Sequence, residues 1–215
     1  MALYTRWFGS LHQSKGFTVI EIPDGYGSQA DVSSILQTSG AFKDKKQMHQ
    51  VYHEVSHQWN VHDTDELPPR WNEGLASFIE WRVADLLDST NQLDYVSNWY
   101  ASEIKKDLET YLERALVAPV DFGTKQIEGM SYTVGGVAFR ILWGVVGEDE
   151  FMRLLKGFYQ SKVATGATAR EFVSYISQNS KHDLTRYVND WWLGTGWAEQ
   201  MKAGKSLAEM EKEYR

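Results

Sequence analysis

The chain has 215 residues, 42% of them hydrophobic and 24% charged, and its formal net charge is -7. This composition is typical of a folded protein with one sizeable core and excludes an intrinsically disordered chain. The negative charge and the scattered lysines and arginines argue against a nucleic-acid partner. The absence of cysteine excludes disulfides and thiolate zinc ligands.

The first residues give two expectations about the chain as a whole. Residues 3–9 resemble the last turns of a helix whose start is missing, so we expect a domain excised from a longer protein. No apolar run is long enough to cross a membrane, so we expect no direct membrane insertion in this segment. A signal or an anchor could lie upstream, and the compartment therefore stays open.

Two β-rich segments follow, at residues 17–23 and 33–40. The first is followed by the turn former Asp24-Gly25, and both segments predict strands. The glycine-containing segment between them has two interpretations. It is either an ordinary turn or the edge of a cleft, where a peptide substrate could add as an extra strand.

A helix predicted to run to about Asn60 carries the residues that point to chemistry. At about 100° per residue, His53 and His57 lie roughly 40° apart, and Glu54 lies within about 60° of His57. A zinc ion in a hydrolytic site takes three protein ligands and leaves a fourth position for water, and imidazoles one turn apart can bind the same ion. We therefore expect His53 and His57 as zinc ligands, with Glu54 free to act as a base.

The third ligand should come from a neighbouring helix, and Glu73 is the leading candidate. Pro68 and Pro69 end the preceding segment and permit a helix to begin. The residues after Glu73 predict a mostly buried helix, on which a carboxylate needs a partner. A loop through residues 61–70 would place Glu73 opposite the two histidines.

Three neighbouring residues are expected to act from outside this ligand set. Asn72 and Glu80 would support the ligands, and His49 either does the same or is simply solvated. An HExxH string alone can also arise by chance, as surface histidines beside an unrelated glutamate. The NExxA block that begins at Asn72 argues against that alternative.

Several blocks along the chain together resemble one family. HEVSHQW at residues 53–59 and WNEGLASF at residues 71–78 resemble the gluzincin metallopeptidases of the aminopeptidase N family, and the likeness spans roughly residues 17–197. The resemblance implies a catalytic tyrosine at Tyr132, which without it would be read as a packed aromatic residue. Gly135 and Gly136 just after it would let this helix approach a neighbour closely. Further matching blocks are SYTVGG (131–136), VGEDEF (146–151) and WWLGTGW (191–197).

Three departures from the family pattern stand out. The segment between His57 and Glu73 is shorter than in the family, and Val134 stands where the family usually has lysine. Residues 25–30 occupy the place of the family's GAMEN segment, whose glutamate grips the free amino terminus of a substrate. Gln29 offers only a neutral dipole there, so we expect weak discrimination in favour of a free amino terminus.

Taken together, the blocks predict an α+β fold like thermolysin-like catalytic domains, with a small amino-terminal sheet, a mainly helical lobe and a zinc cleft between them. Residues 1–200 would form the catalytic domain, and residues 201–215 a polar helical tail that docks weakly. The expected function is hydrolysis of a peptide or protein substrate with one zinc ion, by an aminopeptidase-like enzyme or an endopeptidase. Two alternatives remain: a binding module that has lost turnover, and a zinc hydrolase of an ester or epoxide.

Overall fold

A small three-stranded sheet lies at the amino-terminal end of the fold. The computed structural model describes residues 1–12, 18–31, 34–44, 47–88 and 92–215. The strand order is β1-β3-β2, with β3 parallel to β1 and antiparallel to β2. The strands predicted at residues 17–23 and 33–40 correspond to β1 and β3, while Phe17 and Ser33 lie outside the described residues. The bounds are β1 (Thr18–Ile22), β2 (Gln29–Asp31) and β3 (Ser34–Thr38).

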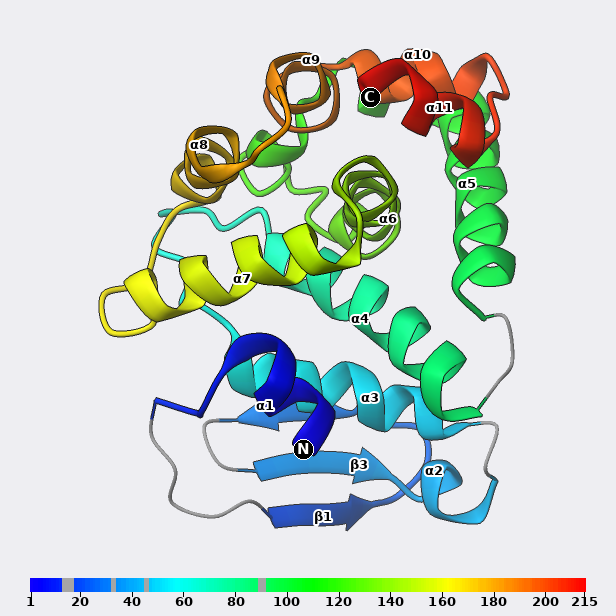
Figure 1. Cartoon of the computed structure of the whole chain (residues 1–215). Coiled ribbons are helices and arrows are strands. Elements are labelled where there is room, and N and C mark those ends of the chain that lie inside the picture. Colours follow the sequence, from blue (N-terminus) through cyan, green and yellow to red (C-terminus); the bar gives the residue numbers. More distant parts are fainter. Residues whose placement is uncertain (13–17, 32–33, 45–46, 89–91) are drawn as a thin grey trace.

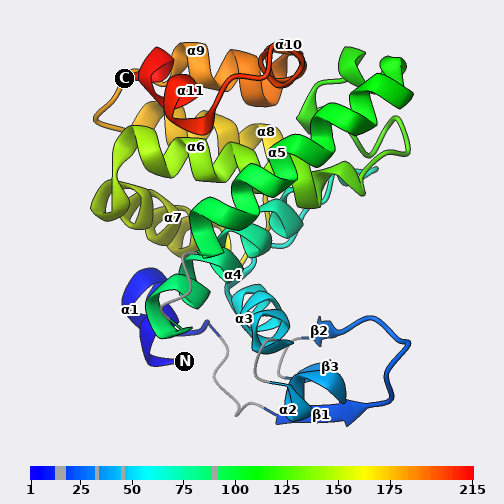
Figure 2. The same cartoon turned by 90° about the vertical axis from the view of Figure 1, so that its right-hand side faces the viewer.

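Helix α3 (Met48–Ser56) lies between this sheet and the remaining helices, together with α1 (Ala2–Phe8) (Figures 1 and 2). A 3₁₀ turn, His57–Trp59, extends α3. Its last residue, Trp59, stacks on Tyr4 of α1 with ring centroids 5.6 Å apart, and its indole nitrogen donates to the Gly9 carbonyl at 2.9 Å. Helix α1 therefore anchors the end of the helix that carries the HExxH string.

Except for α2, which lies beside the sheet, the other helices form a lobe above α3, with α6 seen end-on among its neighbours in Figure 1. The expected order, a small sheet followed by a mainly helical lobe, is confirmed. Short turns occur at Leu112–Leu116 and Pro119–Asp121 (3₁₀) and at Ser131–Gly135 and Asn189–Leu193 (π). The helices are α2 (Gly40–Lys43), α4 (Trp71–Asp88), α5 (Gln92–Thr110), α6 (Gly136–Val146), α7 (Glu148–Lys162), α8 (Ala169–Asn179), α9 (Thr185–Val188), α10 (Gly196–Lys202) and α11 (Leu207–Tyr214).

Two buried helices, α4 and α6, form the centre of the lobe. Phe78 and Ile79 of α4 and Phe139 of α6 are fully buried. The backbones of α4 and the π turn touch at a pair of glycines, because a Cβ built on Gly74 would lie 2.7 Å from the Gly135 Cα. The close approach that the sequence predicts for this glycine-containing helix is therefore confirmed, and it joins the Glu73 and Tyr132 segments directly.

The carboxyl-terminal segment packs more firmly than its composition suggests. Helix α11 begins with a capping box formed by Ser206 and Glu209, and it buries Leu207, Met210 and Tyr214. The expectation of weak docking is wrong, because these apolar residues recur at helical spacing and face α6. The division of the chain at residue 200 stays a prediction.

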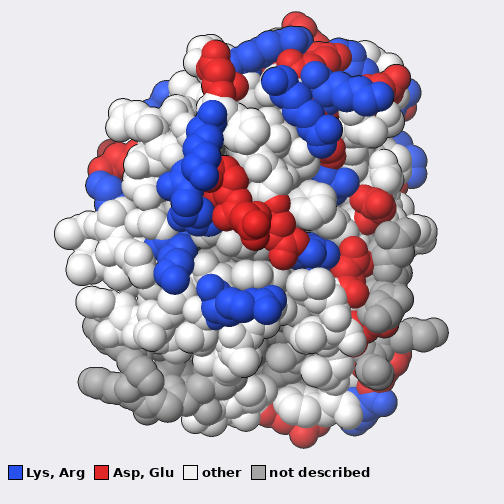
Figure 3. Space-filling view, in the orientation of Figure 1, with Lys and Arg blue, Asp and Glu red and all other residues white. Residues whose placement is uncertain are grey.

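The surface carries charges of both signs. On the face shown in Figure 3, lysine and arginine side chains lie next to aspartate and glutamate over the helical lobe. Among the described residues, no helix combines the length and the apolar character needed to span a bilayer.

Candidate metal centre

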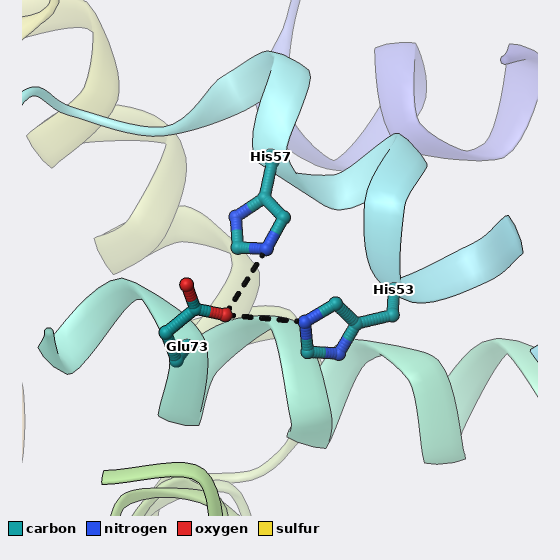
Figure 4. A group of neighbouring side chains, drawn as sticks. All are labelled: His53, His57 and Glu73. Carbon is teal, nitrogen blue, oxygen red and sulfur yellow. Dashed lines mark hydrogen bonds and ion pairs between the residues drawn. The ribbon is translucent and has the colours of Figure 1, made fainter. Parts of the chain in front are cut away.

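The structure brings His53, His57 and Glu73 together at the contact between α3 and the start of α4. The Glu73 Oε2 atom lies 3.2 Å from His53 Nε2 and 3.3 Å from His57 Nε2 (Figure 4). One possible ligand atom from each residue fits within 4.8 Å of the others. Two imidazole nitrogens and one carboxylate oxygen therefore converge on one point, as the sequence predicts.

Local structure explains this convergence. His53 and His57 lie one turn apart, and their ring centroids are separated by 4.9 Å. Helix α4 begins at Trp71, so Glu73 occupies its first turn, where the helix dipole favours a negative charge. The Glu73 backbone N–H donates to the Arg70 carbonyl at 2.9 Å, which fixes this turn. Each of the three side chains is 12–15% exposed, so the group is open to a cavity but mostly shielded.

The charges of this group are strongly coupled. Burial raises the pKa of the Glu73 carboxyl, but hydrogen bonds to His53 and His57 outweigh that effect and hold the pKa well below its usual range. Burial lowers the pKa of His53, but the carboxylates of Glu73 and Glu80 reverse this and raise the pKa to about 9. Without a metal ion, positive charge on the His53 imidazole offsets part of the negative charge of the buried carboxylates.

Other side chains contact the Nδ1 atom of each imidazole, on the side of the ring away from Glu73. Glu80 lies 3.1 Å from His53 Nδ1 through one oxygen and 2.6 Å from His49 Nδ1 through the other. The Asn60 side-chain amide lies 2.6 Å from His57 Nδ1. Such contacts fix the orientation of metal-binding imidazoles and leave their Nε2 atoms directed inward. His49 therefore contacts the same carboxylate as His53, and its supporting role stays a prediction.

Glu54 stands beside the ligand group without belonging to it. Its side chain is buried, and burial raises the pKa of its carboxyl even though His53 and His57 work in the opposite direction. A carboxylate with a raised pKa is better suited to accept a proton near neutral pH than an ordinary exposed one.

Tyr132 reaches the site from the π turn Ser131–Gly135. Its ring stacks on the His53 ring with centroids 6.0 Å apart and an angle of 10°. Its hydroxyl accepts a hydrogen bond from Arg70 at 3.1 Å. Burial and then the nearby Glu73 raise the pKa of Tyr132 to about 12, so the phenol keeps its proton. A π turn at this point is in keeping with the frequent use of such turns at functional sites.

A cavity of about 980 Å³ opens beside the group and is lined by residues of both parts of the molecule. Glu54 and Tyr132 line it from the helical side, and Gln29 and Asp31 of strand β2 line it from the sheet. Ser28 is held by the Gln37 side chain, which donates to its hydroxyl at 2.9 Å. Strand β2 therefore lies at the edge of a cavity, and the addition of a peptide strand there stays a prediction.

Sequence reasoning missed two residues of this site, Asn60 and Arg70. Asn60 ends the 3₁₀ turn three residues after His57, a spacing that could have signalled contact. Arg70 stands three residues before Glu73 and could have been noted as its ion partner. Asn72 was expected to support the ligands, but its amide instead donates to the Val61 carbonyl at 2.9 Å and so ties down the loop after His57.

The residues present suit a zinc ion by their chemistry. Zinc takes imidazole nitrogen and carboxylate oxygen as ligands, and hydrolytic sites use three protein ligands. The donor set of His53, His57 and Glu73 matches this requirement, and Glu80 and Asn60 occupy the outer nitrogens of the two imidazoles.

The chain is similar to several known proteins in sequence and in fold. The domain of peptidase family M1 matches residues 32–191. Leucyl aminopeptidase of Saccharolobus solfataricus is 25% identical over 205 residues, which cover 87% of this chain and 26% of the relative. A mutant of the M1 zinc metallopeptidase from Deinococcus radiodurans is similar with a TM-score of 0.66 and 15% identity over 88% of this chain and 42% of that chain. The same mutant bound to a Tyr-Ser-Ala substrate gives a TM-score of 0.65 at 15% identity, over 88% of this chain and 42% of that chain. The chain thus spans well under half of these relatives.

Proposed function

Because the chain belongs to peptidase family M1, whose members include zinc metallopeptidases, we propose that it hydrolyses peptide bonds with one zinc ion held by His53, His57 and Glu73. The observation that carries the proposal is the position of Glu73 Oε2 between the two imidazole Nε2 atoms, with Glu54 alongside. A bound zinc ion would lower the pKa of a water molecule and polarise a carbonyl group.

The residues of the chain would divide the remaining work. Glu54 takes the proton of the attacking water, for which its raised pKa is suitable. Tyr132 keeps its own proton and donates a hydrogen bond to the oxyanion that develops on the carbonyl oxygen. Glu80 and Asn60 keep the two imidazoles oriented.

A peptide substrate would lie in the cavity against strand β2. The residues of this strand line the cavity, and an exposed strand edge can bind an extended peptide through its backbone groups. Gln29 stands in the segment where related enzymes carry a glutamate for the substrate amine. Since a glutamine cannot neutralise an ammonium group, we propose a relaxed requirement for a free amino terminus and hydrolysis of blocked or extended peptides as well.

One observation favours the stricter aminopeptidase alternative. Asp63 lines the same cavity, and its Oδ2 atom is buried without a hydrogen-bond partner among the described residues. Burial raises the pKa of this carboxyl to about 6, and an ammonium group nearby would relieve the cost of keeping it charged. Preference for a free amine would then come from Asp63 in place of Gln29.

The decisive experiment compares the parent chain with the Glu54→Gln variant after zinc loading. The parent should hydrolyse members of a peptide library, whereas the variant should lose at least about 100-fold in kcat while keeping its zinc content and its Tm. Zinc binding without hydrolysis by the parent would support a binding module, and hydrolysis of esters or epoxides alone would support the other zinc hydrolase. Near-native activity of the variant would remove Glu54 from the mechanism.

A further inference from the structure

The guanidinium of Arg70 contacts two parts of the site that lie far apart in the sequence. Its Nη2 donates a hydrogen bond to Glu73 Oε1 at 2.8 Å and another to the Tyr132 hydroxyl at 3.1 Å. Its central carbon also lies 5.5 Å from the centroid of the Tyr132 ring. The same side chain therefore touches a proposed metal ligand and the proposed oxyanion donor.

The two carboxylate oxygens of Glu73 face different partners. Oε2 lies next to the two imidazole Nε2 atoms, whereas Oε1 accepts the hydrogen bond from Arg70. Hydrogen bonds between a guanidinium and a carboxylate are strong and directional. Arg70 therefore leaves Oε2 as the oxygen that is available to a cation beside the imidazoles.

The backbone around Arg70 is held in an uncommon conformation. Its φ of 59° lies in the left-handed region, which residues with a Cβ rarely adopt. The hydroxyl of Ser131 donates to the Pro69 carbonyl, so the consecutive residues 69 and 70 pair with the consecutive residues 131 and 132. Such outliers persist only where the surrounding structure fixes them, and they concentrate at functional sites.

An ordinary surface ion pair does not account for this arrangement. Exposed pairs three residues apart on a helix contribute little, because solvent screens them. Here the Arg70 side chain is 47% exposed, but Glu73 is only 15% exposed and already bonded to two imidazoles. The main effect of the guanidinium is therefore to orient Glu73 and Tyr132, and its contribution to the stability of the fold is small.

We propose that Arg70 is a positioning residue of the zinc site, which keeps Glu73 in one orientation toward the metal and holds the Tyr132 hydroxyl beside it. The part of this inference that concerns catalysis rests on the proposed function. The part that concerns metal binding can be measured without any turnover.

The test uses Arg70→Gly, because glycine adopts a left-handed backbone freely and the fold should survive the change. The Tm of the zinc-free variant should equal or exceed that of the parent. Its zinc affinity, measured by competition with a chromogenic chelator, should fall by about 10–100-fold. The kcat for a peptide should also fall while KM changes little, and guanidinium chloride at a non-denaturing concentration should restore part of both losses.

The matched control is Arg170→Ala, because Arg170 pairs with Asp121 at the surface and its replacement should leave every value unchanged. Equal zinc affinity and equal kcat in the parent and Arg70→Gly would overturn the inference. NaCl at the same ionic strength controls for a general salt effect. If guanidinium chloride restores zinc affinity and kcat no better than NaCl does, the inference is also overturned, because the loss then reflects a disturbed backbone. Failure of the parent to bind zinc would overturn the proposed function itself, and the two failures are therefore distinguishable.

Discussion

The proposed metal ligands and the strand that should receive the substrate are built in different ways. The ligands lie on helices α3 and α4, are 12–15% exposed, and contact outer partners such as Glu80. Strand β2 has three residues and lies at an edge of the sheet, and both Gln29 and Asp31 are exposed. The helical side thus buries most of each proposed ligand, whereas the sheet side presents exposed side chains to the cavity.

This difference suggests that the positioning of the proposed catalytic groups and the recognition of substrate depend on different parts of the molecule. Interactions that hold catalytic groups depend on a rigid surrounding, which the buried helices provide. The proposed recognition of the peptide would depend on an exposed strand edge, where substitutions cost little stability. Changes on the helical side should therefore act on zinc and on kcat, and changes in β2 should act on the choice of substrate.

The largest effect is expected for His57→Ala, which removes one proposed ligand from the helical side. The zinc content should fall close to zero after loading and dialysis, and hydrolysis should fall to background, because two ligands hold the ion too weakly. Metal analysis and a peptide assay provide the measurement. His62→Ala is the matched control, because His62 lines the same cavity outside the ligand group. Full zinc retention in His57→Ala would contradict the assignment.

A smaller loss is expected for Tyr132→Phe. The phenyl ring can keep its stacking on His53, while the hydrogen bond to the oxyanion disappears. The kcat should fall by roughly 10²–10³-fold with little change in KM. Tyr159→Phe serves as the control, since Tyr159 lines the same cavity and its hydroxyl accepts a hydrogen bond from the His12 backbone N–H. Steady-state kinetics that put the loss in KM would contradict the role of Tyr132.

The zinc-free protein should lose stability as the pH rises. The folded state raises the pKa of His53 to about 9 from 6.5, so the contribution of His53 is fully present below pH 6.5 and is lost as the pH passes through 9. The loss should be at most about 3 kcal/mol. Thermal unfolding of chelator-treated protein between pH 6 and about 9.5 measures it. The zinc-loaded protein should not show this decline, and a flat profile for the zinc-free form would contradict the coupling.

The smallest effect is expected on the sheet side, for a matched pair of peptides with a free and an acetylated amino terminus. Because Gln29 cannot neutralise the amine, acetylation should change kcat/KM by less than about tenfold. Gln29→Glu should enlarge this preference while leaving the kcat for the free peptide nearly unchanged. If acetylation lowers kcat/KM of the parent by a hundredfold, about 2.7 kcal/mol of amine recognition exists and the stricter aminopeptidase alternative is correct.

Local patterns were sufficient to predict much of the site. The spacing of His53 and His57 depends only on helix geometry, and the prolines before Glu73 mark the start of its helix. The capping box of Thr168 and Glu171 at the start of α8 follows from the same kind of local pattern. Tyr132 needed the family resemblance, because a single tyrosine carries no spacing signal. Its role and those of the ligands stay predictions that the variants above would test.

Contacts between distant segments could not be predicted in this way. The pairing of β2 with β3, the bond from Arg70 to Tyr132 and the packing of Met210 against the lobe all depend on how elements meet in space. The end of α5 at Thr110 and the 3₁₀ turn that follows it also depend on such packing. Tertiary packing overrides local propensity at such places.

Because neither Gly74 nor Gly135 has a side chain, the segments that carry Glu73 and Tyr132 can approach each other closely. A methyl group at position 74 would overlap the facing backbone at 2.7 Å, whereas one at position 135 would meet the Gly74 Cα at 3.1 Å and need a shift of only a few tenths of an ångström. Gly74→Ala should therefore separate the Glu73 and Tyr132 segments by a larger distance than Gly135→Ala does. The two variants would change the distance between Glu73 and Tyr132 without replacing either residue. The smaller change is comparable to the error in position that a catalytic site tolerates.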